Sequence, residues 1–108
     1  MSVFAALSDP TRLRIVELLA VRDRTAGEIV AQFDFTAPAI SQHLKILREA
    51  RLVSVRADGQ RRIHSLDPAG IEEVEQWLSR TKRFWESRLD ALERELRAED
   101  ERKRRKKK

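Results

Sequence analysis

The stretch of sequence that decides the fold is TAPAISQHLKILREARL, residues 36–52. Its first residue, Thr36, is a good helix cap, and Pro38 falls in the first helical turn, where a missing N–H costs nothing. Apolar residues then recur at the spacing of one helix face, namely Ile40, Leu44 and Leu47. The pattern predicts a helix that starts after Thr36 and packs this face on a core.

The opposite face of this predicted helix carries Pro38 together with Ser41, Gln42 and Lys45. A hydroxyl, an amide and an ammonium group suit base edges and phosphates, and the alanines at the start of the helix allow close approach to a groove wall. An ordinary solvated helix face is the alternative interpretation. This helix alone does not decide between the two, so the neighbouring segments must.

The composition fits one helical domain with a modest core, since the chain has 108 residues, of which 41% are hydrophobic and 38% charged. No apolar run approaches the roughly 20 residues of a membrane span, and the N-terminus lacks the basic-then-apolar pattern of a signal peptide. Without cysteine there is no disulfide framework and no thiolate metal site. We therefore expect a cytoplasmic protein with no membrane partner.

The net charge of +5 is unevenly distributed along the chain. Residues 36–66 hold six basic and two acidic side chains, residues 67–101 hold six basic and eleven acidic ones, and residues 102–108 are all basic. A basic middle segment joined to an acidic one is typical of a polyanion-binding face attached to a separate interaction element.

Two helices are predicted before residues 36–52. Val3, Phe4 and Leu7 indicate a short apolar helix, and Asp9 with Pro10 opens the next one as cap and first helical residue. The wide apolar face of this second helix predicts a position in the middle of the domain. We expect a core formed by Leu13, Val16, Leu19, Ile29, Phe33, Ile40, Leu44 and Leu47.

Residues 22–24 are predicted to form a loop, and a short helix with a capping box follows it. In such a box the Thr25 hydroxyl and the Glu28 carboxylate cap each other's backbone amides. The short helix ends near Phe35, and Thr36 caps the next helix almost at once. Two helices joined by so tight a turn, the second polar on its outer face, predict a helix-turn-helix.

A two-stranded hairpin is predicted next, because the apolar period becomes alternating after residue 51 and Asp58-Gly59 is a strong hairpin signal. Its polar and basic residues near the turn are Arg56, Gln60, Arg61 and Arg62. Guanidinium groups placed there suit a phosphate backbone or a minor groove. A hairpin tip that only aids solubility is the alternative.

A last helix, starting at Asp67-Pro68 and about 40 Å long, is predicted for the C-terminal part. Its apolar stripe consists of Ile71, Val74, Leu78, Thr81, Trp85, Leu89, Leu92 and Leu96, with Trp77 and Phe84 beside it. A thin monomer cannot bury this stripe, so we expect a partner helix, most simply that of a second copy. Packing on its own domain is the alternative. The domain is predicted to span residues 1–97, followed by a disordered tail at 98–108.

These elements and motifs resemble the ArsR/SmtB family of bacterial winged helix-turn-helix repressors over residues 3–96, most specifically at 7–19, 41–50 and 59–66. The resemblance implies a mainly α fold with a small β-hairpin, in the order α-α-α-α-β-β-α, and a long C-terminal dimerisation helix. It also implies a homodimer that binds an inverted-repeat operator in double-stranded DNA and represses its own operon.

Carried over residue by residue, the resemblance assigns two sets of site residues. The DNA-binding set is Thr36, Pro38, Ser41, Gln42, His43, Lys45, Arg56, Gln60, Arg61 and Arg62, in which His43 packs or contacts a phosphate. The dimer interface is Val3, Phe4, Leu7, Trp77, Leu78, Thr81, Trp85, Leu89, Leu92 and Leu96, from the first and last helices.

The chain departs from the family's metal sensors, which carry a cysteine pair before the recognition helix or His and acidic ligands on the last helix. It has no cysteine, and its two histidines, His43 and His64, lie on different predicted elements and neither on the last helix. Two such residues are too few for a closed metal site. We therefore expect the non-metal branch, with no metal or cofactor, and the sequence leaves any small-molecule effector unknown.

Two other functions are alternatives to DNA regulation. An enzyme fits least, because there is no Gly-rich phosphate loop and neither histidine has a triad context. A helical dimeric protein-interaction module with only non-specific nucleic-acid affinity is the main alternative, although it does not explain the basic hairpin. Binding to unrelated duplex DNA at varied salt distinguishes the two, since an interaction module without its basic tail should show almost none.

Overall fold

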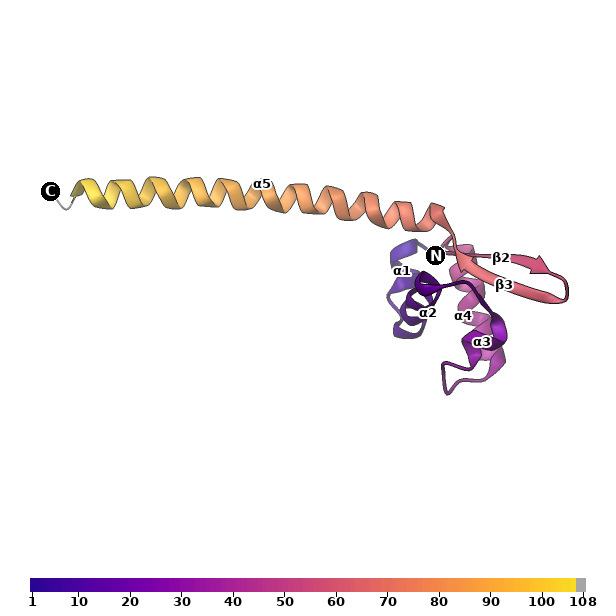
Figure 1. Ribbon diagram of the computed structural model, residues 1–108. Helices are drawn as coiled ribbons and strands as arrows, with labels where there is room; N and C mark the ends of the chain where they lie inside the picture. Colours follow the sequence, from indigo (N-terminus) through magenta and orange to yellow (C-terminus); the bar gives the residue numbers. More distant parts are fainter. Residues whose placement is uncertain (107–108) are drawn as a thin grey trace. The chain divides into compact units, whose positions relative to one another are not determined.

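The computed structural model describes residues 1–106, which form five helices and three short strands (Figure 1). In chain order these are α1 Val3–Leu7, α2 Pro10–Val21, β1 Arg24–Thr25, α3 Ala26–Val30, α4 Ala37–Glu49, β2 Val53–Asp58, β3 Arg61–Leu66 and α5 Pro68–Lys106. The chain divides into two compact units, Met1–Val74 and the segment from Glu75 onward. The mainly helical class with a hairpin, predicted from the sequence, is confirmed.

Helices α2, α3 and α4 start at the predicted caps. The carboxylate of Asp9 accepts hydrogen bonds from the backbone N–H groups of Thr11 and Arg12, and the Thr36 hydroxyl accepts one from Ala39. Both bonds of the Thr25–Glu28 capping box are present. Hydrogen bonds to Glu28, first from the Arg22 guanidinium and then from Thr25, lower the pKa of this carboxyl to about 2. Local polar chemistry therefore determines where these helices begin.

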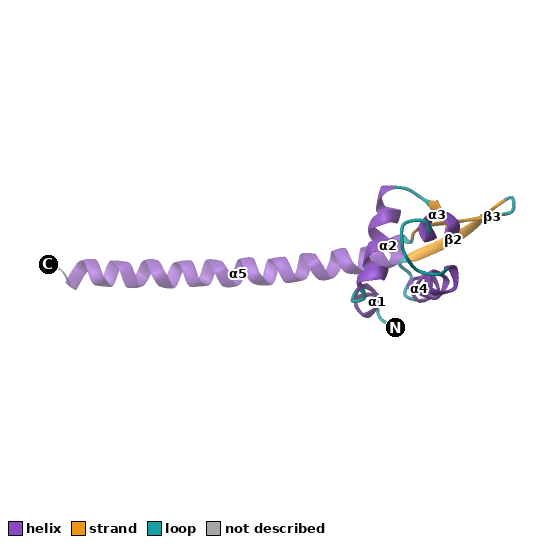
Figure 2. Ribbon diagram, turned by 90° about the horizontal axis from the view of Figure 1, so that it is seen from below, coloured by secondary structure: helices purple, strands orange, loops and turns teal. Residues whose placement is uncertain are grey.

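The sheet has three antiparallel strands in the order β1-β3-β2, one more than the predicted hairpin (Figure 2). The hairpin pairs Val53 with Leu66 at its base and Asp58 with Arg61 at its turn, where Gly59 has a φ of 63°. Strand β1 consists of Arg24, predicted to lie in a loop, and Thr25, predicted to cap the next helix, and it pairs with Ile63 and His64 of β3. Two residues are too few to show an alternating pattern, so the prediction missed a strand that exists only through this pairing.

The core of the first unit contains most of the predicted residues, with one error. Leu13, expected in the core, is 42% exposed, and Ile15 is fully buried in its place. The apolar face of α2 is so wide that the sequence did not indicate which part of it meets the other helices. Val16 and Phe33 are partly buried against the core, and its buried members are Val3, Ala6, Ile15, Leu19, Ile29, Ile40, Leu44, Leu47, Ala50, Leu52 and Val53.

A close backbone joint connects the end of α4 to the start of α5. Arg51 has a φ of 60° and ends α4 in a left-handed turn, in which Leu52 N–H donates to the Leu47 carbonyl. Gly70 N–H donates to the Arg51 carbonyl oxygen at 2.8 Å, and a Cβ on Gly70 would lie 2.3 Å from that oxygen. Only glycine therefore allows this approach.

Helix α5 continues to Lys106, although residues 98–108 were predicted to be disordered. The loss of the apolar stripe after Leu96 removes packing but not the local support of a helix. Acids precede bases by four residues at 99 and 103, 100 and 104, and 101 and 105, and cations in the last turn favour the helix dipole. Residues 107–108 of the predicted tail lie outside the described residues, and the domain boundary at residue 97 stays a prediction.

The described helices include none that combines the length and the apolar composition needed to cross a membrane. Even α5, the longest, carries charged side chains along its whole length.

Candidate nucleic-acid interface

Helix α4 has a buried face and an exposed polar face, as its sequence predicts. Ile40, Leu44 and Leu47 are buried in the core, whereas Ser41, Gln42 and Lys45 are exposed. The cap at Thr36 and the joint at Arg51 fix both ends of the helix. The polar side chains of α4 are therefore presented outward from a rigid support.

His43 belongs to α4 but is turned partly inward. Its Nδ1 lies 3.5 Å from a terminal guanidinium nitrogen of Arg12, and Nε of Arg12 donates to the Ala6 carbonyl at 2.7 Å. The hydrogen bond from the Arg12 backbone is the largest influence on Asp9 and lowers the pKa of this carboxyl. Arg12 thus connects the end of α1 to the middle of α4. This role of Arg12 was not predicted, because its contact with His43 joins residues far apart in the sequence.

The basic side chains of the hairpin are exposed and only loosely paired. A terminal guanidinium nitrogen of Arg56 lies 3.0 Å from a carboxylate oxygen of Asp23. A terminal guanidinium nitrogen of Arg61 lies 3.1 Å from a carboxylate oxygen of Asp58. Exposed ion pairs of this kind contribute roughly 0–1 kcal/mol, so a phosphate can replace the carboxylate at little cost. Arg62 and Gln60 are exposed beside the same turn.

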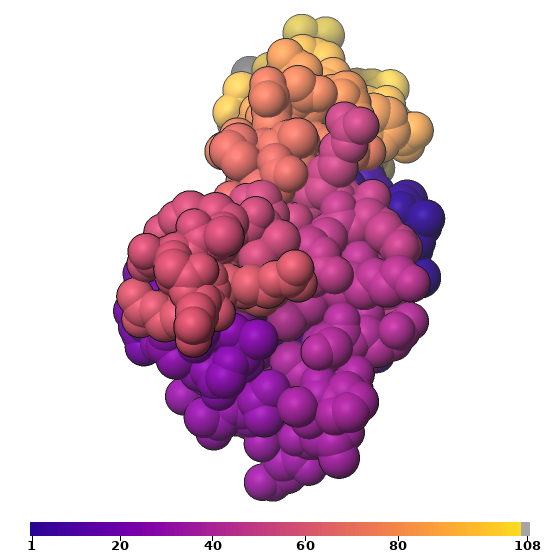
Figure 3. Space-filling view, turned by 90° about the vertical axis from the view of Figure 1, so that its right-hand side faces the viewer, coloured from indigo at the N-terminus to yellow at the C-terminus, as the bar shows by residue number. Residues whose placement is uncertain are grey.

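The hairpin and α4 share one face of the first unit. In Figure 3 the rose-coloured hairpin projects toward the viewer beside the magenta surface of α4 and the turn that precedes it. The two predicted DNA-binding sets, one on α4 and one at the hairpin, therefore lie on neighbouring surfaces of the same compact unit.

His64 occupies the base of this hairpin and is a structural residue. It is 4% exposed, and its Nδ1 is buried without a hydrogen-bond partner among the described residues. Burial, and then the charge of Arg48, lowers the pKa of His64. The side chain is thus neutral near pH 7, and it does not belong to the exposed surface.

The described residues 1–106 contain no group of three or more His, Cys, Asp or Glu side chains arranged to hold a metal ion. The absence of a metal site stays a prediction of the sequence.

The predicted dimer residues fall into two groups, one on α1 and one on α5. On α1, Val3 is 3% exposed and lies in the core of its own chain. A helix of five residues must bury one side to stay attached, and Val3 lies on that side with Ala6. Phe4 is exposed on α1, and Leu7 is partly buried against the core.

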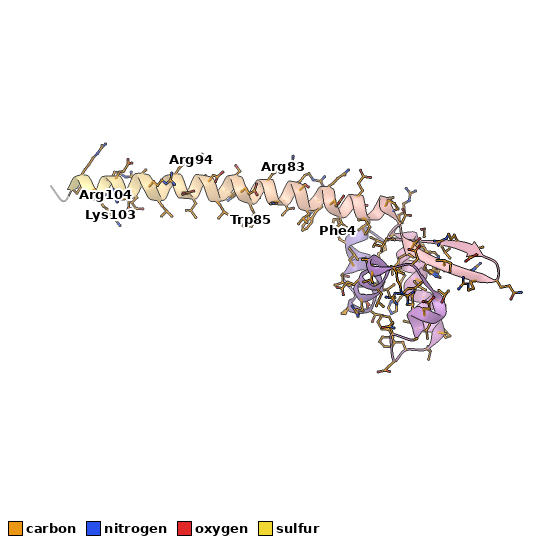
Figure 4. The ribbon with its side chains drawn as sticks, in the orientation of Figure 1. Phe4, Arg83, Trp85, Arg94, Lys103 and Arg104 are labelled. Carbon is orange, nitrogen blue, oxygen red and sulfur yellow. The ribbon has the colours of Figure 1, made fainter. Side chains whose placement is uncertain are left out.

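The second group lies on α5 beyond Val74 and stays largely exposed. Thr81 is partly buried, and the other members are 45–60% exposed. The group consists of Trp77, Leu78, Thr81, Trp85, Leu89, Leu92 and Leu96. Trp85 points to one side of α5, whereas Arg83 and Arg94 point to the other (Figure 4). Beside the stripe, the Arg88 guanidinium lies 5.0 Å from the centre of the Phe84 ring. This part of α5 is an amphipathic helix with an exposed apolar stripe.

A helix-turn-helix followed by a hairpin on the same face defines the first unit as a winged helix-turn-helix, in which α4 is the recognition helix and the hairpin is the wing. Comparison with known proteins gives the same class. Residues 9–55 match the family described as bacterial regulatory protein, arsR family.

Two curated proteins and a solved structure extend this match. The transcriptional repressor SdpR of Bacillus subtilis (strain 168) is 40% identical over 77 residues, which cover 71% of this chain and 86% of that protein. The HTH-type transcriptional regulator Rv2034 of Mycobacterium tuberculosis is 45% identical over 80 residues, 74% of this chain and 72% of that protein. A crystal structure of a possible transcriptional regulator for arsenical resistance has a TM-score of 0.69 at 36% identity, covering 75% of this chain and 84% of that one.

The chain belongs to the arsR family of bacterial transcriptional regulators. The family resemblance and the winged helix-turn-helix fold predicted from the sequence are both confirmed.

Proposed function

We propose that this regulator represses transcription as a homodimer that places one α4 helix in each half of an inverted-repeat operator. The observation that carries the proposal is the exposed polar face of α4 beside the basic wing, on a helix whose opposite face is buried in the core. Base edges in a major groove and the phosphates next to it require these two kinds of side chain.

Base recognition is assigned to the middle of α4. The amide of Gln42 can accept from and donate to the major-groove edge of adenine, and the Ser41 hydroxyl can contact any base that approaches it. Lys45 lies one turn further along and suits a phosphate, since an ammonium is a point charge without a fixed direction. Thr36 and Pro38 lie at the end of the helix that approaches the groove first, and the partly inward His43 supports α4 from behind.

The wing supplies contacts that do not depend on sequence. Arg56, Arg61 and Arg62, with the amide of Gln60, are assigned to phosphates or to the adjacent minor groove. When these guanidinium groups neutralise phosphates they release counterions from the DNA, so this binding is sensitive to salt.

Dimerisation is assigned to the exposed stripe of α5, together with Phe4 and Leu7 of α1. One α4 helix and one wing make too few contacts for tight specific binding, and two copies at a fixed separation meet two major grooves on one side of the duplex. A stripe with two tryptophans is the kind of surface that a second copy covers. The proposal assigns no catalytic role, metal or cofactor to the chain.

The test is selection of duplexes from a random library by the full chain, followed by affinity measurements on the selected and on scrambled duplexes at several salt concentrations. The proposal expects an inverted repeat with half-sites about one helical turn apart, bound at least ~1,000-fold more tightly than scrambled DNA. The same measurements on residues 1–97 remove the contribution of the basic end. A chain that enriches no sequence, and whose binding to all DNA disappears with residues 98–108, would instead be the protein-interaction module.

A further inference from the structure

The end of α4 that approaches the groove first is apolar as well as uncharged. Residues 35–44, FTAPAISQHL, contain no acidic side chain, no lysine and no arginine. Phe35 is 50% exposed, and Ala37 and Pro38 in the first turn of α4 are exposed as well. The polar face of α4 starts only at Ser41, one turn later.

The exposed Phe35 ring is held in place. Its centroid lies 6.0 Å from that of Phe33 in a stacked arrangement with 28° between the planes. Phe33 is itself partly buried and packs against the core. A ring that served only the core would be covered by it, whereas this ring keeps half its surface in water beside the first turn of the recognition helix.

The major groove offers few partners for such a surface. The base edges there are hydrogen-bond donors and acceptors, and the one apolar group among them is the C5-methyl group of thymine. An apolar surface that covers a polar base edge removes that edge from water without a new hydrogen bond, which is unfavourable. Contact with a methyl group buries apolar area on both sides and is favourable.

We propose that Phe35, Ala37 and Pro38 form a methyl-recognition surface that reads the C5-methyl group of a pyrimidine in each operator half-site. The inference rests on the proposed function, because it requires α4 to enter the major groove. Thymine and 5-methylcytosine share this group, so either base can supply it.

The helix geometry separates the methyl-recognition surface from the Gln42 amide. Pro38 and Gln42 are four residues apart, which is about 6 Å along α4. The methyl-recognition surface therefore meets a different base from the one that Gln42 contacts. Specificity at this base comes from a hydrocarbon contact and does not depend on the Gln42 amide.

The experiment uses the full chain and the duplex selected from a random library. Each thymine of a half-site is replaced in turn by deoxyuridine, which lacks only the methyl group. At one or two positions near the Gln42 contact, we expect the loss of one methyl to weaken binding about fourfold. Phe35→Ala should bind the unmodified duplex more weakly and should no longer distinguish thymine from deoxyuridine. Phe35→Leu, which restores an apolar side chain, should recover part of that distinction.

Two controls keep the outcome interpretable. Gln42→Ala should lose affinity but keep the full thymine-to-deoxyuridine ratio, because its amide contacts a different base. The thermal unfolding of each variant is measured first, and the ratio between the two duplexes is insensitive to the fraction of folded protein. Cytosine and 5-methylcytosine are compared at the responsive position. An equal gain on methylation identifies the methyl group itself as the ligand, and no gain restricts the ligand to thymine.

Indifference of the unaltered chain to every deoxyuridine, or full sensitivity in Phe35→Ala, would overturn the inference while leaving sequence-specific binding intact. Unchanged DNA binding in Phe35→Ala would overturn it too. If no duplex is enriched at all, the proposed function fails and the inference fails with it.

Discussion

The first unit, Met1–Val74, and the α5 segment from Glu75 onward differ in how far their apolar side chains are buried. The first unit buries Ile15, Ile29, Ile40 and Leu47 completely within one chain. The α5 segment leaves Trp85 and Leu89 more than half exposed on a helix held by its own backbone bonds. The difference agrees with the proposal that one chain forms the whole reading surface, whereas a second copy covers the stripe of the α5 segment.

A charge in the exposed stripe tests the dependence of α5 on a partner. Leu89→Glu places two carboxylates in an apolar contact, so we expect a folded monomer in sedimentation equilibrium. Operator affinity should fall more than ~100-fold, since each half-site alone gathers too few contacts. Ser87→Glu, on the side of α5 away from the stripe, is the matched control and should remain dimeric. A dimeric Leu89→Glu protein would show that the interface lies elsewhere.

The joint at Gly70 tests whether the independence of the first unit extends to the first turn of α5. Gly70→Ala forces a Cβ against the Arg51 carbonyl, and we expect a loss of about 1–3 kcal/mol in the free energy of unfolding. Gly27→Ala is the control, because its Cβ meets only the Thr25 hydroxyl at 4.0 Å. Urea denaturation of both variants makes the comparison. Equal stability of the two would mean that the joint relaxes freely.

Base recognition should be separable from folding and from dimerisation. Gln42→Ala removes an exposed amide, so the stability and the dimer should be unaffected. Affinity for the selected operator should fall by about 1–3 kcal/mol, and affinity for scrambled DNA should hardly change. Lys45→Ala should weaken both duplexes alike, as expected for a phosphate contact. Parallel losses in the two variants would remove Gln42 from the reading surface.

The wing should affect all DNA sequences and their salt dependence. In residues 1–97, replacing Arg61 and Arg62 by alanine should reduce the slope of log affinity against log salt by about 1–2. The paired replacement of Arg80 and Arg83 in α5 changes the net charge equally and should leave the slope nearly unchanged. A slope that responds equally to both pairs would indicate a general charge effect.

The smallest expected effect concerns His64 and tests its burial in the first unit. Burial lowers the pKa of His64 from its ordinary 6.5, so the unfolded chain binds the proton more readily than the folded one. The free energy of unfolding should therefore be highest above pH ~6.5 and decrease as the pH falls from there toward the lowered pKa. His64→Gln should show a shallower decrease between pH ~7 and ~5.5 in urea denaturation. The same slope in both proteins would mean that His64 titrates normally.

Local signals in the sequence were sufficient for much of the first unit. The caps at Asp9, Thr25 and Thr36 and the turn at Gly59 each depend on residues close in sequence, and all were predicted. The periodicity of α4 separated its buried and exposed faces correctly, because its apolar residues Ile40, Leu44 and Leu47 all fall on one face of the helix.

The errors concern features that depend on distant residues. Strand β1 exists through its pairing with β3, and the exposure of Leu13 depends on which side of α2 meets the remaining helices. The bonds of Arg12 to Ala6 and His43 likewise connect three elements. For residues 98–106 the error was of another kind, since the absence of an apolar stripe was interpreted as disorder although the residues favour a helix.

The three-stranded sheet has a consequence for the motion of the wing. Within residues 1–106, strand β1 pairs only with Ile63 and His64, so the hairpin residues nearer the turn have a single neighbouring strand there. Amide hydrogens at the base should exchange slowly with solvent, whereas those beside Gly59 should exchange quickly. The wing would then keep a fixed direction at its base while its arginines adjust to grooves of different width. One protein could in this way bind operators whose flanking sequences, and therefore shapes, differ.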